Sequence, residues 1–536
     1  MKRLIAGFLA CVIAVTVVAV PAATVQAAGY HEYDMEDYVI QEMDAANIMG
    51  ISMSVVSDEK EIYSAAFGAD TQTGDDYILG SLVQSMTALS ILRMVEDGEI
   101  QLNDILSEYL PDYTNLQNVT IEELLTQTSG ISRSALSADG SDLSVQNGVG
   151  KYEESYANYN LLGKVIEVVS GETYEEYLTE NILDPCKMGS TFSLRQNPEL
   201  SGQVKPVYQT ILGYPNKIKF QYQEGQWADV SSGYLLSDVK DMGSYLQMYL
   251  KNDGEVMQQD SIHQILQESQ KIQEVTPTNH LFGTEEAYTM GWISTEVEGT
   301  QVYYQMSCLA DTMAYMLLVP EKNAGIIMMF NAADYMVGRK MTRSICAGVT
   351  RILLDQKPEH IKPGTYFKQH GTIDLLLLLL LIAVWMPILL IGVWGKRVSA
   401  KFSILRLIKD LLLHIGLPTA MLFLLPRYFG PWRVWREYTP DLVYVAWIVI
   451  GTLYLGAVVK LLQFIVVLIR GRLHVADEEE IRDPILPVVK SDTGVVGGFV
   501  MIDPLDDELT DEDEVEEEIE MEIEEEIESE EEDLRD

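Results

Sequence analysis

The amino-acid sequence predicts an α/β (α+β) domain with an antiparallel sheet flanked by helices, followed by a three-helix membrane region and a disordered acidic tail. Two observations lead to this prediction. Charge and apolar residues are segregated along the chain, and strand-like segments at both ends of the first 365 residues enclose helical ones. The chain has 536 residues, of which 47% are hydrophobic and 22% charged, with a formal net charge of −44. A hydrophobic fraction of 47% is that of an ordinary globular protein, and it is incompatible with a chain that is acidic and disordered throughout.

Acidic and basic residues are distributed unevenly. Residues 1–365 carry 49 acidic and 22 basic residues, the predicted membrane region 366–474 carries 4 and 12, and residues 475–536 carry 28 and 3. This segregation excludes a single soluble globule. It also excludes a nucleic-acid-binding function, because no exposed segment offers a basic surface to phosphates.

The N-terminus has the pattern of a secretory signal peptide. Lys2 and Arg3 form a charged region, residues 4–20 are apolar apart from a threonine and a glycine, and a stretch of small residues follows. This order predicts that residues 1–27 are removed on export. Residues 28–365 would then form an extracytoplasmic domain. The alternative is that the segment stays attached as an N-terminal membrane anchor.

Three apolar runs predict membrane-spanning helices, at about residues 375–394, 405–425 and 442–469. The first has 20 residues without a charge, enough to cross the hydrocarbon core as a helix. Lysine and arginine are concentrated in the loop 395–410 and at the end of the third run, so we expect these segments and the tail to be cytoplasmic. If the second run were a re-entrant or surface helix, the tail would instead lie outside.

The C-terminal segment, residues 475–536, is predicted to be a disordered cytoplasmic tail. Between Asp511 and Asp536, 18 of 26 residues are Asp or Glu, and repulsion between them opposes folding. Apolar residues nevertheless recur every four positions, a spacing that would align them on one helix face: Val515, Ile519, Ile523 and Ile527. We hypothesise that a cationic cytoplasmic partner induces this helix.

The sequence contains no motif for a metal ion or a cofactor. Its seven histidines are scattered without ligand spacing, and it has no glycine-rich phosphate-binding loop. The cysteines beyond the signal peptide are too few and too scattered for a disulfide framework, although one pair remains open. We therefore expect neither a metal centre nor a cofactor, and free thiols at Cys186, Cys308 and Cys346.

Residues 28–365 show the pattern of a sheet assembled from both ends of the domain. Two strands, 51–56 and 61–67, flank a turn, and a buried helix follows from 81 to 96 with apolar residues at a 3.6-residue period. Gly98 suits the C-terminal end of this helix. Further helices are predicted at 121–126, 160–170 and 239–250, and late strands at 291–297, 301–306, 313–319 and 325–330.

Several short segments follow one another in a characteristic order along this domain. They are Tyr77–Ala88, Val95–Asp104, Leu124–Ile131, Leu161–Gly163, Gly233–Ser237, Met290–Trp292 and Val319–Asn331. Together they resemble the serine β-lactamase-related family, which includes class C β-lactamases, D-alanyl-D-alanine carboxypeptidases and penicillin-binding-protein-like enzymes. The resemblance covers roughly residues 45–350 and implies a serine β-lactamase/transpeptidase-like fold.

The resemblance implies that Ser81, at the start of the buried helix, holds the position of the family's nucleophile. In the family a lysine three residues later helps to remove the serine proton, since that spacing puts both side chains on one helix face. Gln84 occupies the lysine position here. An amide neither takes up a proton at neutral pH nor carries positive charge, so it cannot replace the lysine. Without this base, Ser81 would serve only as a helix N-cap.

The other two motifs of the family are also altered. Ungapped alignment of the second motif, Tyr-x-Asn, places Glu154 and Tyr156 at its functional positions, whereas a two-residue shift would restore Tyr156-Ala157-Asn158. The third motif, His-x-Gly or Lys-x-Gly, is replaced by Gln305 and Ser307. This change removes the cation or imidazole and the glycine that lets a substrate backbone approach the strand.

Loss of all three motifs predicts a pseudoenzyme. A degenerate site would gather Gln84, Glu154 and Gln305 around the Ser81 hydroxyl, whereas a lysine or histidine within reach would favour an enzyme. The expected function is binding or sensing of peptidoglycan-like peptides or acyl compounds at a bacterial cell membrane. One alternative is a serine hydrolase of esterase, amidase or D-aminopeptidase type with altered activation of Ser81, for example by Glu154. Another is a structural membrane protein that recruits partners through its tail.

Overall fold

The computed structural model describes residues 35–480 apart from internal gaps. The predicted signal peptide, residues 481–536 of the predicted tail and most of the predicted loop 395–410 lie outside the described residues. The gaps are residues 69, 134–142, 146–147, 203, 220–228, 253, 255, 259–260, 263–264, 267–269, 272–279, 310–311, 391–392, 394–403 and 430–431.

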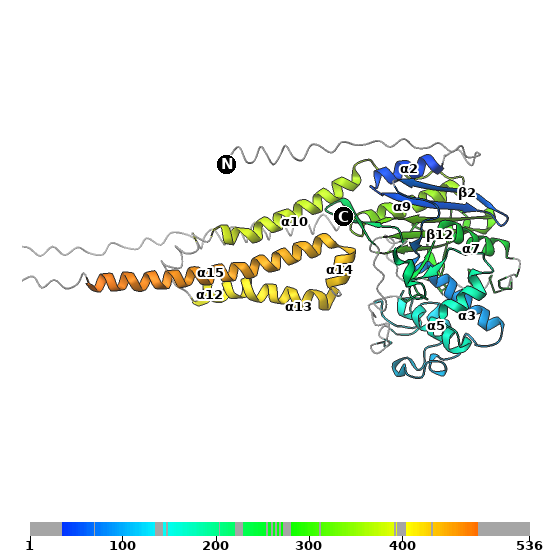
Figure 1. The fold of residues 1–536 in the computed structure, drawn as a ribbon, viewed down its shortest axis with the longest axis horizontal. Coiled ribbons are helices and arrows are strands. Elements are labelled where there is room, and N and C mark those ends of the chain that lie inside the picture. The colour runs from blue at the N-terminus through cyan, green and yellow to red at the C-terminus, as the bar shows by residue number, and fades with distance from the viewer. Residues whose placement is uncertain are drawn as a thin grey trace, which may run out of the picture. The chain divides into compact units, whose positions relative to one another are not determined.

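The centre of the N-terminal domain is an eight-stranded antiparallel sheet (Figure 1). Its strands are β1 (Gly50–Val56), β2 (Glu61–Gly68), β8 (Gln270–Lys271), β9 (Glu286–Tyr288), β10 (Ile293–Val297), β11 (Thr300–Cys308), β12 (Met313–Val319) and β13 (Ala324–Phe330). They lie in the order β2-β1-β13-β12-β11-β10-β9-β8. β1 pairs with β13, with Met53 opposite Met328, so the sheet is assembled from both ends of the domain, as predicted.

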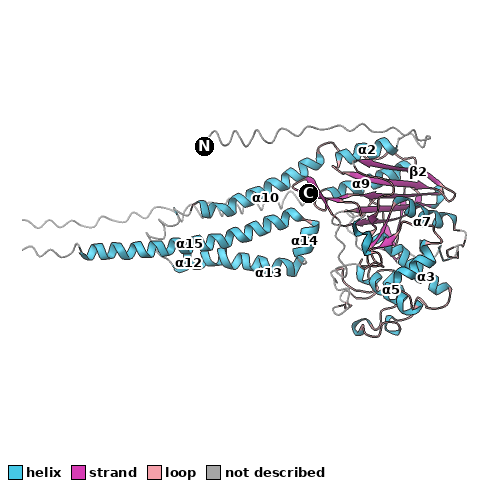
Figure 2. Cartoon of the chain, in the orientation of Figure 1, coloured by secondary structure: helices cyan, strands magenta, loops and turns pink. Residues whose placement is uncertain are grey.

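Helices cover both faces of the sheet (Figure 2). Along the fully buried strand β12, Met316 and Leu318 pack into one core, while Tyr315 and Leu317 pack into the other. This alternation follows from the two-residue period of a strand. The second core contains α2 (Met35–Ala45) and α9 (Gly338–Leu353), whereas the first contains α3 (Val83–Glu96), α5 (Tyr156–Ser170) and α7 (Val239–Lys251).

The helical lobe agrees with the predicted helices, with local differences. The predicted helix 81–96 begins with a 3-10 turn, η1 (Gly80–Leu82), before α3, and the predicted helix 160–170 begins earlier, at Tyr156. Two shorter helices complete this lobe, α4 (Ile121–Leu125) and α6 (Tyr174–Leu178).

Two small sheets and one strand boundary were not foreseen. The predicted strand 291–297 begins only at Ile293, because Thr289 and Trp292 close a turn in which Gly291 adopts a φ of +85°. The small sheets have the orders β3-β7-β4 and β14-β5-β6. Their strands are β3 (Tyr77–Ile78), β4 (Phe192–Ser193), β5 (Val207–Ile211), β6 (Tyr214–Ile218), β7 (Leu235–Ser237) and β14 (Ala332–Ala333).

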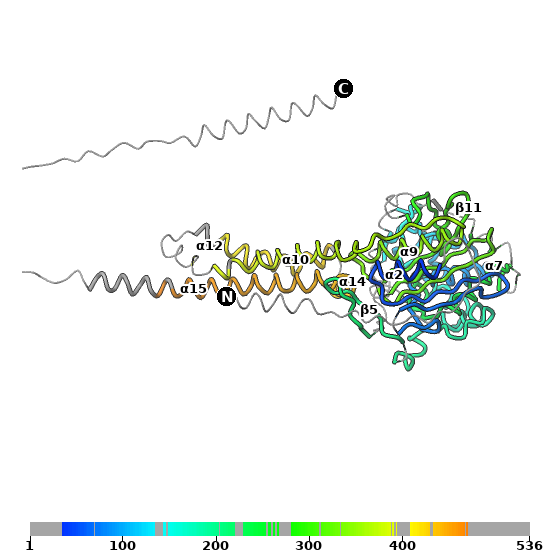
Figure 3. Tube along the Cα trace, turned by 90° about the horizontal axis from the view of Figure 1, so that it is seen from above, coloured from blue at the N-terminus to red at the C-terminus, as the bar shows by residue number. Residues whose placement is uncertain are grey.

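Among the described residues after the domain, three helical segments are long and apolar enough to cross a membrane: Thr365–Met386, Ile408–Tyr428 and Pro440–Val466. The first begins earlier than the predicted 375. Apolar residues of all three pack together, including Leu381, Met421 and Val449, and α10 and α15 lie side by side (Figure 3). The elements here are α10 (Thr365–Leu389), α12 (Ile404–Leu411), η8 (Leu412–Gly416), α13 (Leu417–Phe429), α14 (Trp432–Tyr438) and α15 (Pro440–Glu480).

The helix α15 extends beyond the predicted end of the third span. Residues 475–480, which we assigned to the disordered tail, are the last residues of this helix. The helix therefore continues past Gly471 into the first acidic residues.

Close packing of α2 on α9 makes Gly348 sensitive to substitution. A Cβ atom at Gly348 would lie 1.9 Å from the Tyr38 hydroxyl oxygen, so Gly348→Ala should lower the free energy of unfolding by about 1–3 kcal/mol through overpacking. Gly189→Ala is the control, because a Cβ there meets nothing within 4 Å. Chemical denaturation of the purified full-length variants measures both, and equal stability of the two variants would contradict the predicted contact.

Candidate functional site

Ser81 lies in the η1 turn directly before α3. Backbone hydrogen bonds fasten this turn to the segment around β7: the amides of Leu79 and Gly80 donate to the carbonyls of Leu235 (2.9 Å) and Gly233 (3.0 Å). The Ser81 side chain caps neither η1 nor α3, and the residue is only 3% exposed. The expectation that Ser81 is a helix N-cap is therefore wrong, because the residue already lies inside the turn and its hydroxyl points to other partners.

Two side chains hydrogen-bond the Ser81 hydroxyl. The phenol oxygen of Tyr156 lies 2.9 Å from Ser81 Oγ, and Ser81 donates to Glu154 Oε1 at 3.4 Å. Glu154 precedes α5, and Tyr156 is the first residue of that helix. Within the part of the chain that the structure describes, neither a lysine nor a histidine bonds this hydroxyl. The structure thus brings together the serine and both residues that the ungapped alignment assigned to the second motif.

Gln84 lies one turn further along α3, among neutral groups. It is fully buried, and its Oε1 accepts hydrogen bonds from the Tyr288 hydroxyl (3.1 Å) and from Gln127 Nε2 (3.3 Å). Tyr288 in turn donates to the Tyr159 hydroxyl at 3.1 Å. Gln84 therefore does not join the hydrogen bonds of Ser81. The group at the lysine position belongs to a buried, uncharged network.

Gln127 is the centre of that network, and the sequence motif did not identify it as a site residue. Its Oε1 accepts hydrogen bonds from the Ser155 amide (2.9 Å) and from Asn158 Nδ2 (2.5 Å). These bonds hold the start of α5, and with it Glu154, beside Ser81. One signal was available in the sequence, because Gln127 stands where the related family has histidine. Its φ of +59° is visible only in the structure. Tyr288 had no such signal, since its contact with Gln84 joins distant segments.

The third motif faces the same lobe but does not reach the serine hydroxyl. Gln305 is 3% exposed, and its Nε2 donates to the Gly291 carbonyl at 3.2 Å, while its Oε1 accepts from the Met306 amide. This side chain fastens β11 to the turn before β10. Of the three residues expected around Ser81, the structure therefore places only Glu154 there, and Gln84 and Gln305 bind elsewhere.

Ser307 packs against the turn that carries the serine. A Cβ atom at Gly80 would lie 1.9 Å from Ser307 Oγ, and Gly80 itself has a φ of +55°. Glycine at position 80 is therefore required both by its backbone conformation and by the approach of β11. Because Ser307 is 1% exposed, its side chain fills the space between this strand and the turn.

Burial keeps the Tyr156 phenol, which bonds Ser81, and the Cys308 thiol protonated. Burial, reinforced by the nearby Glu154 carboxylate, raises the pKa of the Tyr156 phenol well above its usual value. Burial likewise raises the pKa of the Cys308 thiol to about 11. The Arg339 guanidinium opposes both shifts. Tyr156 can therefore donate a hydrogen bond to Ser81 Oγ at neutral pH, while Ser81 donates its own hydrogen bond to Glu154 Oε1.

The chain is similar to known proteins over its first two thirds. A family model described as Beta-lactamase matches residues 35–345. Protein flp of Staphylococcus aureus strain MRSA252 is 25% identical over 329 residues, which cover 56% of this chain and 63% of that protein. The putative penicillin-binding protein PbpX of Bacillus subtilis strain 168 is 36% identical over 124 residues, covering 21% and 31% of the two chains. The match therefore spans less than two thirds of the length of these relatives.

Solved structures share the fold. A penicillin-binding protein homologue from Pyrococcus abyssi superposes with a TM-score of 0.54 at 24% identity, over 62% of this chain and 80% of that one. A D-amino acid amidase from Ochrobactrum anthropi gives 0.50 at 16% identity, over 60% and 99%. The family model matches more than half of the sequence. The antiparallel sheet and the serine at the start of a buried helix are consistent with that match. The chain therefore belongs to the beta-lactamase family.

Proposed function

We propose that this chain is a membrane-anchored pseudoenzyme of its family, whose N-terminal domain binds or senses cell-wall-type peptides or acyl compounds without hydrolysing them. The observation that supports this most directly is the placement of Gln84. A base must lie within hydrogen-bond reach of the proton that it removes. Gln84 can accept no proton at neutral pH, and its amide oxygen is engaged by Tyr288 and Gln127.

The geometry around Ser81 supports the same proposal. A serine nucleophile needs an open approach for the acyl carbonyl and donors for the developing oxyanion. Ser81 is only 3% exposed, and Ser307 occupies the space beside Gly80 where a glycine would leave room. Removal of the base and narrowing of the approach act together against acylation.

A carboxylate-bearing ligand suits the charge near the site. The positive charge of Arg339, on α9, opposes the rise in the pKa of both Tyr156 and Cys308. Its guanidinium lies 5.2 Å from the centre of the Tyr335 ring. An arginine is well suited to bind a carboxylate through two parallel hydrogen bonds. Penicillins and peptidoglycan stem peptides both carry carboxylates, and the names of the relatives point to the penicillin-binding class. We therefore propose that Arg339 recognises the carboxylate of the ligand.

The membrane region and the tail complete the proposal. With residues 28–365 outside a bacterial cell and three spans, the tail is cytoplasmic, where its acidic residues would attract a cationic partner. Ligand binding outside could then be coupled to a partner inside. Recruitment through the tail alone would make this chain a structural protein, and it would need no ligand.

A second function is favoured by one contact. Glu154 Oε1 accepts the hydrogen bond of Ser81 at 3.4 Å, a contact that would have to shorten to about 2.6–3.2 Å in a substrate complex for Glu154 to act as a general base. In that case the chain would be a slow serine hydrolase in which Glu154 replaces the lysine and Tyr156 donates to the leaving group.

Active-site probes distinguish these two functions. Full-length protein in detergent should remain unlabelled by a fluorophosphonate and by a fluorescent penicillin, because no lysine or histidine of the described residues bonds Ser81 to remove its proton. Labelling that disappears in Ser81→Ala but persists in Ser85→Ala, a buried serine one turn away, would contradict the pseudoenzyme. If Glu154 is the base, Glu154→Gln should reduce that labelling rate about 10²–10⁴-fold.

Restoration of the motifs should restore acylation. Two variants share Gln84→Lys, Gln305→His and Ser307→Gly. The first also carries Glu154→Tyr and Tyr156→Asn, as the ungapped alignment requires, and the second keeps both residues. One of the two should label with penicillin at least about 10²-fold faster than the wild type, because a base is worth that much.

The identity of the faster variant decides the alignment of the second motif. Thermal unfolding checks that both variants fold. If both fold and neither labels, then loss of the motifs does not explain the absence of activity.

Ligand binding is tested by the thermal stability of the full-length protein. A muropeptide at 100 times its dissociation constant should stabilise the wild type by about 2.7 kcal/mol and raise the melting temperature. Arg339→Gln should weaken binding by about tenfold or more, because it removes a charge-assisted hydrogen bond. Lys340→Gln removes the same charge from a neighbouring exposed position of α9 and should leave the shift unchanged. A wild type that shows no shift would favour the purely structural function.

A further inference from the structure

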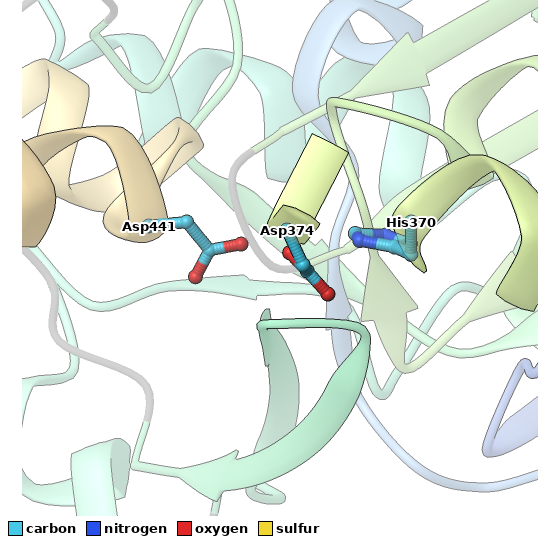
Figure 4. Close-up of side chains that lie close together, drawn as sticks. All are labelled: His370, Asp374 and Asp441. Carbon is cyan, nitrogen blue, oxygen red and sulfur yellow. The ribbon is translucent and has the colours of Figure 1, made fainter. Parts of the chain in front are cut away.

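Three side chains with metal-binding atoms meet where the first and third spans begin. His370 and Asp374 lie one turn apart on α10, a spacing that puts both on one helix face. Asp441 comes from the start of α15. One potential ligand atom from each residue lies within 4.8 Å of those of the other two, and Figure 4 shows the three side chains next to one another.

Two atoms of this group are buried without a hydrogen-bond partner in the described part of the chain. They are His370 Nδ1 and Asp374 Oδ1. The His370 residue is 2% exposed, so water does not replace the missing partner at its surface. Buried polar atoms in native proteins are nearly always paired, and a bound ion is one of the few explanations for an exception.

The other ring nitrogen of His370 has the partner that metal-binding histidines use. His370 Nε2 lies 2.7 Å from Asp334 Oδ2. Asp334 is itself held by the amides of Met336 and Gly338, each at 3.0 Å. A histidine that donates from Nε2 to a carboxylate presents the lone pair of Nδ1, and such a carboxylate orients the ring for a metal ion.

The turn between β5 and β6 closes the group on another side. The Leu212 amide donates to Asp441 Oδ1 at 2.9 Å. A Cβ atom at Gly213, which has a φ of +74°, would lie 3.3 Å from His370 Cγ, so glycine lets the turn cover the ring. The Asp441 carboxylate keeps further lone pairs for a cation.

We propose that His370, Asp374 and Asp441 bind a divalent transition-metal ion of the zinc class. One imidazole and two carboxylates suit such an ion, whereas Mg²⁺ and Ca²⁺ prefer oxygen ligands alone. The ion would also balance the two carboxylates, which are costly to bury at a membrane boundary without a counter-charge. Metal–ligand bonds of about 2.0–2.2 Å place two ligands at most about 4.4 Å apart, so the side chains close in slightly on binding.

This site would join three parts of the chain. α10 supplies two ligands, α15 supplies the third, and Asp334 and the β5–β6 turn of the N-terminal domain support them. A bound ion would therefore fasten the first and third spans to the domain. The proposal is independent of the chemistry at Ser81.

The test uses full-length protein in detergent, stripped with a chelator and titrated with Zn²⁺. The wild type should bind one tight equivalent and melt at a higher temperature, and Mg²⁺ should not compete. His370→Gln and Asp374→Asn should remove the tight equivalent. Asp334→Asn should weaken it about 10–100-fold, because it disturbs only the orientation of the ring. His360→Gln is the control, since that histidine pairs with Glu42 elsewhere and should leave binding unchanged.

Nitrogen ligation separates this site from the acidic tail, which could also attract Zn²⁺. Residues 475–536 contain no histidine, so an imidazole ligand in the X-ray absorption spectrum excludes a site made of tail carboxylates alone, and its loss in folded His370→Gln assigns it to His370. This measurement on the wild type stands even if a variant fails to fold. The absence of a tight equivalent, ligation by oxygen alone, or tight binding retained in folded His370→Gln would each overturn the proposal.

Discussion

Antiparallel pairing of β1 with β13 is the contact on which the rest of the fold depends. Ile51 lies opposite Phe330, so the pairing joins the two ends of the domain and encloses the helical lobe as a long insertion. It also completes both cores, because alternate residues of β13, such as Ile327 and Met328, point to opposite faces. Such pairing of distant segments costs loop-closure entropy, which the burial of apolar side chains on both faces offsets.

At Ser81 the fold of the family is kept, but the side chains that contact the serine hydroxyl differ from the family's motifs. β11 and the η1 turn approach closely enough to require glycine at position 80, and the Ser307 side chain fills the space between them. The Ser81 hydroxyl bonds the Tyr156 phenol and the Glu154 carboxylate, whereas Gln84 and Gln305 bind elsewhere. Gln127 holds this arrangement in place from its own strained backbone conformation. The scaffold of a serine hydrolase is thus retained, while the charge that would activate its serine is absent from the contacts of that hydroxyl.

The junction between the N-terminal domain and the membrane region differs from the Ser81 site, because several ionisable side chains gather there. Asp334, His370 and Asp441 link the N-terminal domain to the first and third spans through short polar contacts. Further into the spans, Lys460 and Asp410 form an ion pair at 2.5 Å. Charged groups inside apolar helices persist when they are paired or neutralised. Polar contacts of this kind fix how the helices are rotated against one another, which packing of leucines alone does not specify.

The sequence by itself determined the classes of segment: two-residue and 3.6-residue periods located the main strands and helices, and charge segregation located the membrane region. It also determined that Gln84 stands at the lysine position. The tertiary structure decided what those periods cannot encode, namely which distant side chains meet. Tyr288 reaches Gln84, Gln305 turns to Gly291, and Asp441 joins the helix that carries His370. The physical reason is that local periodicity reports which face of an element is buried, whereas a site depends on contacts made when separate elements pack.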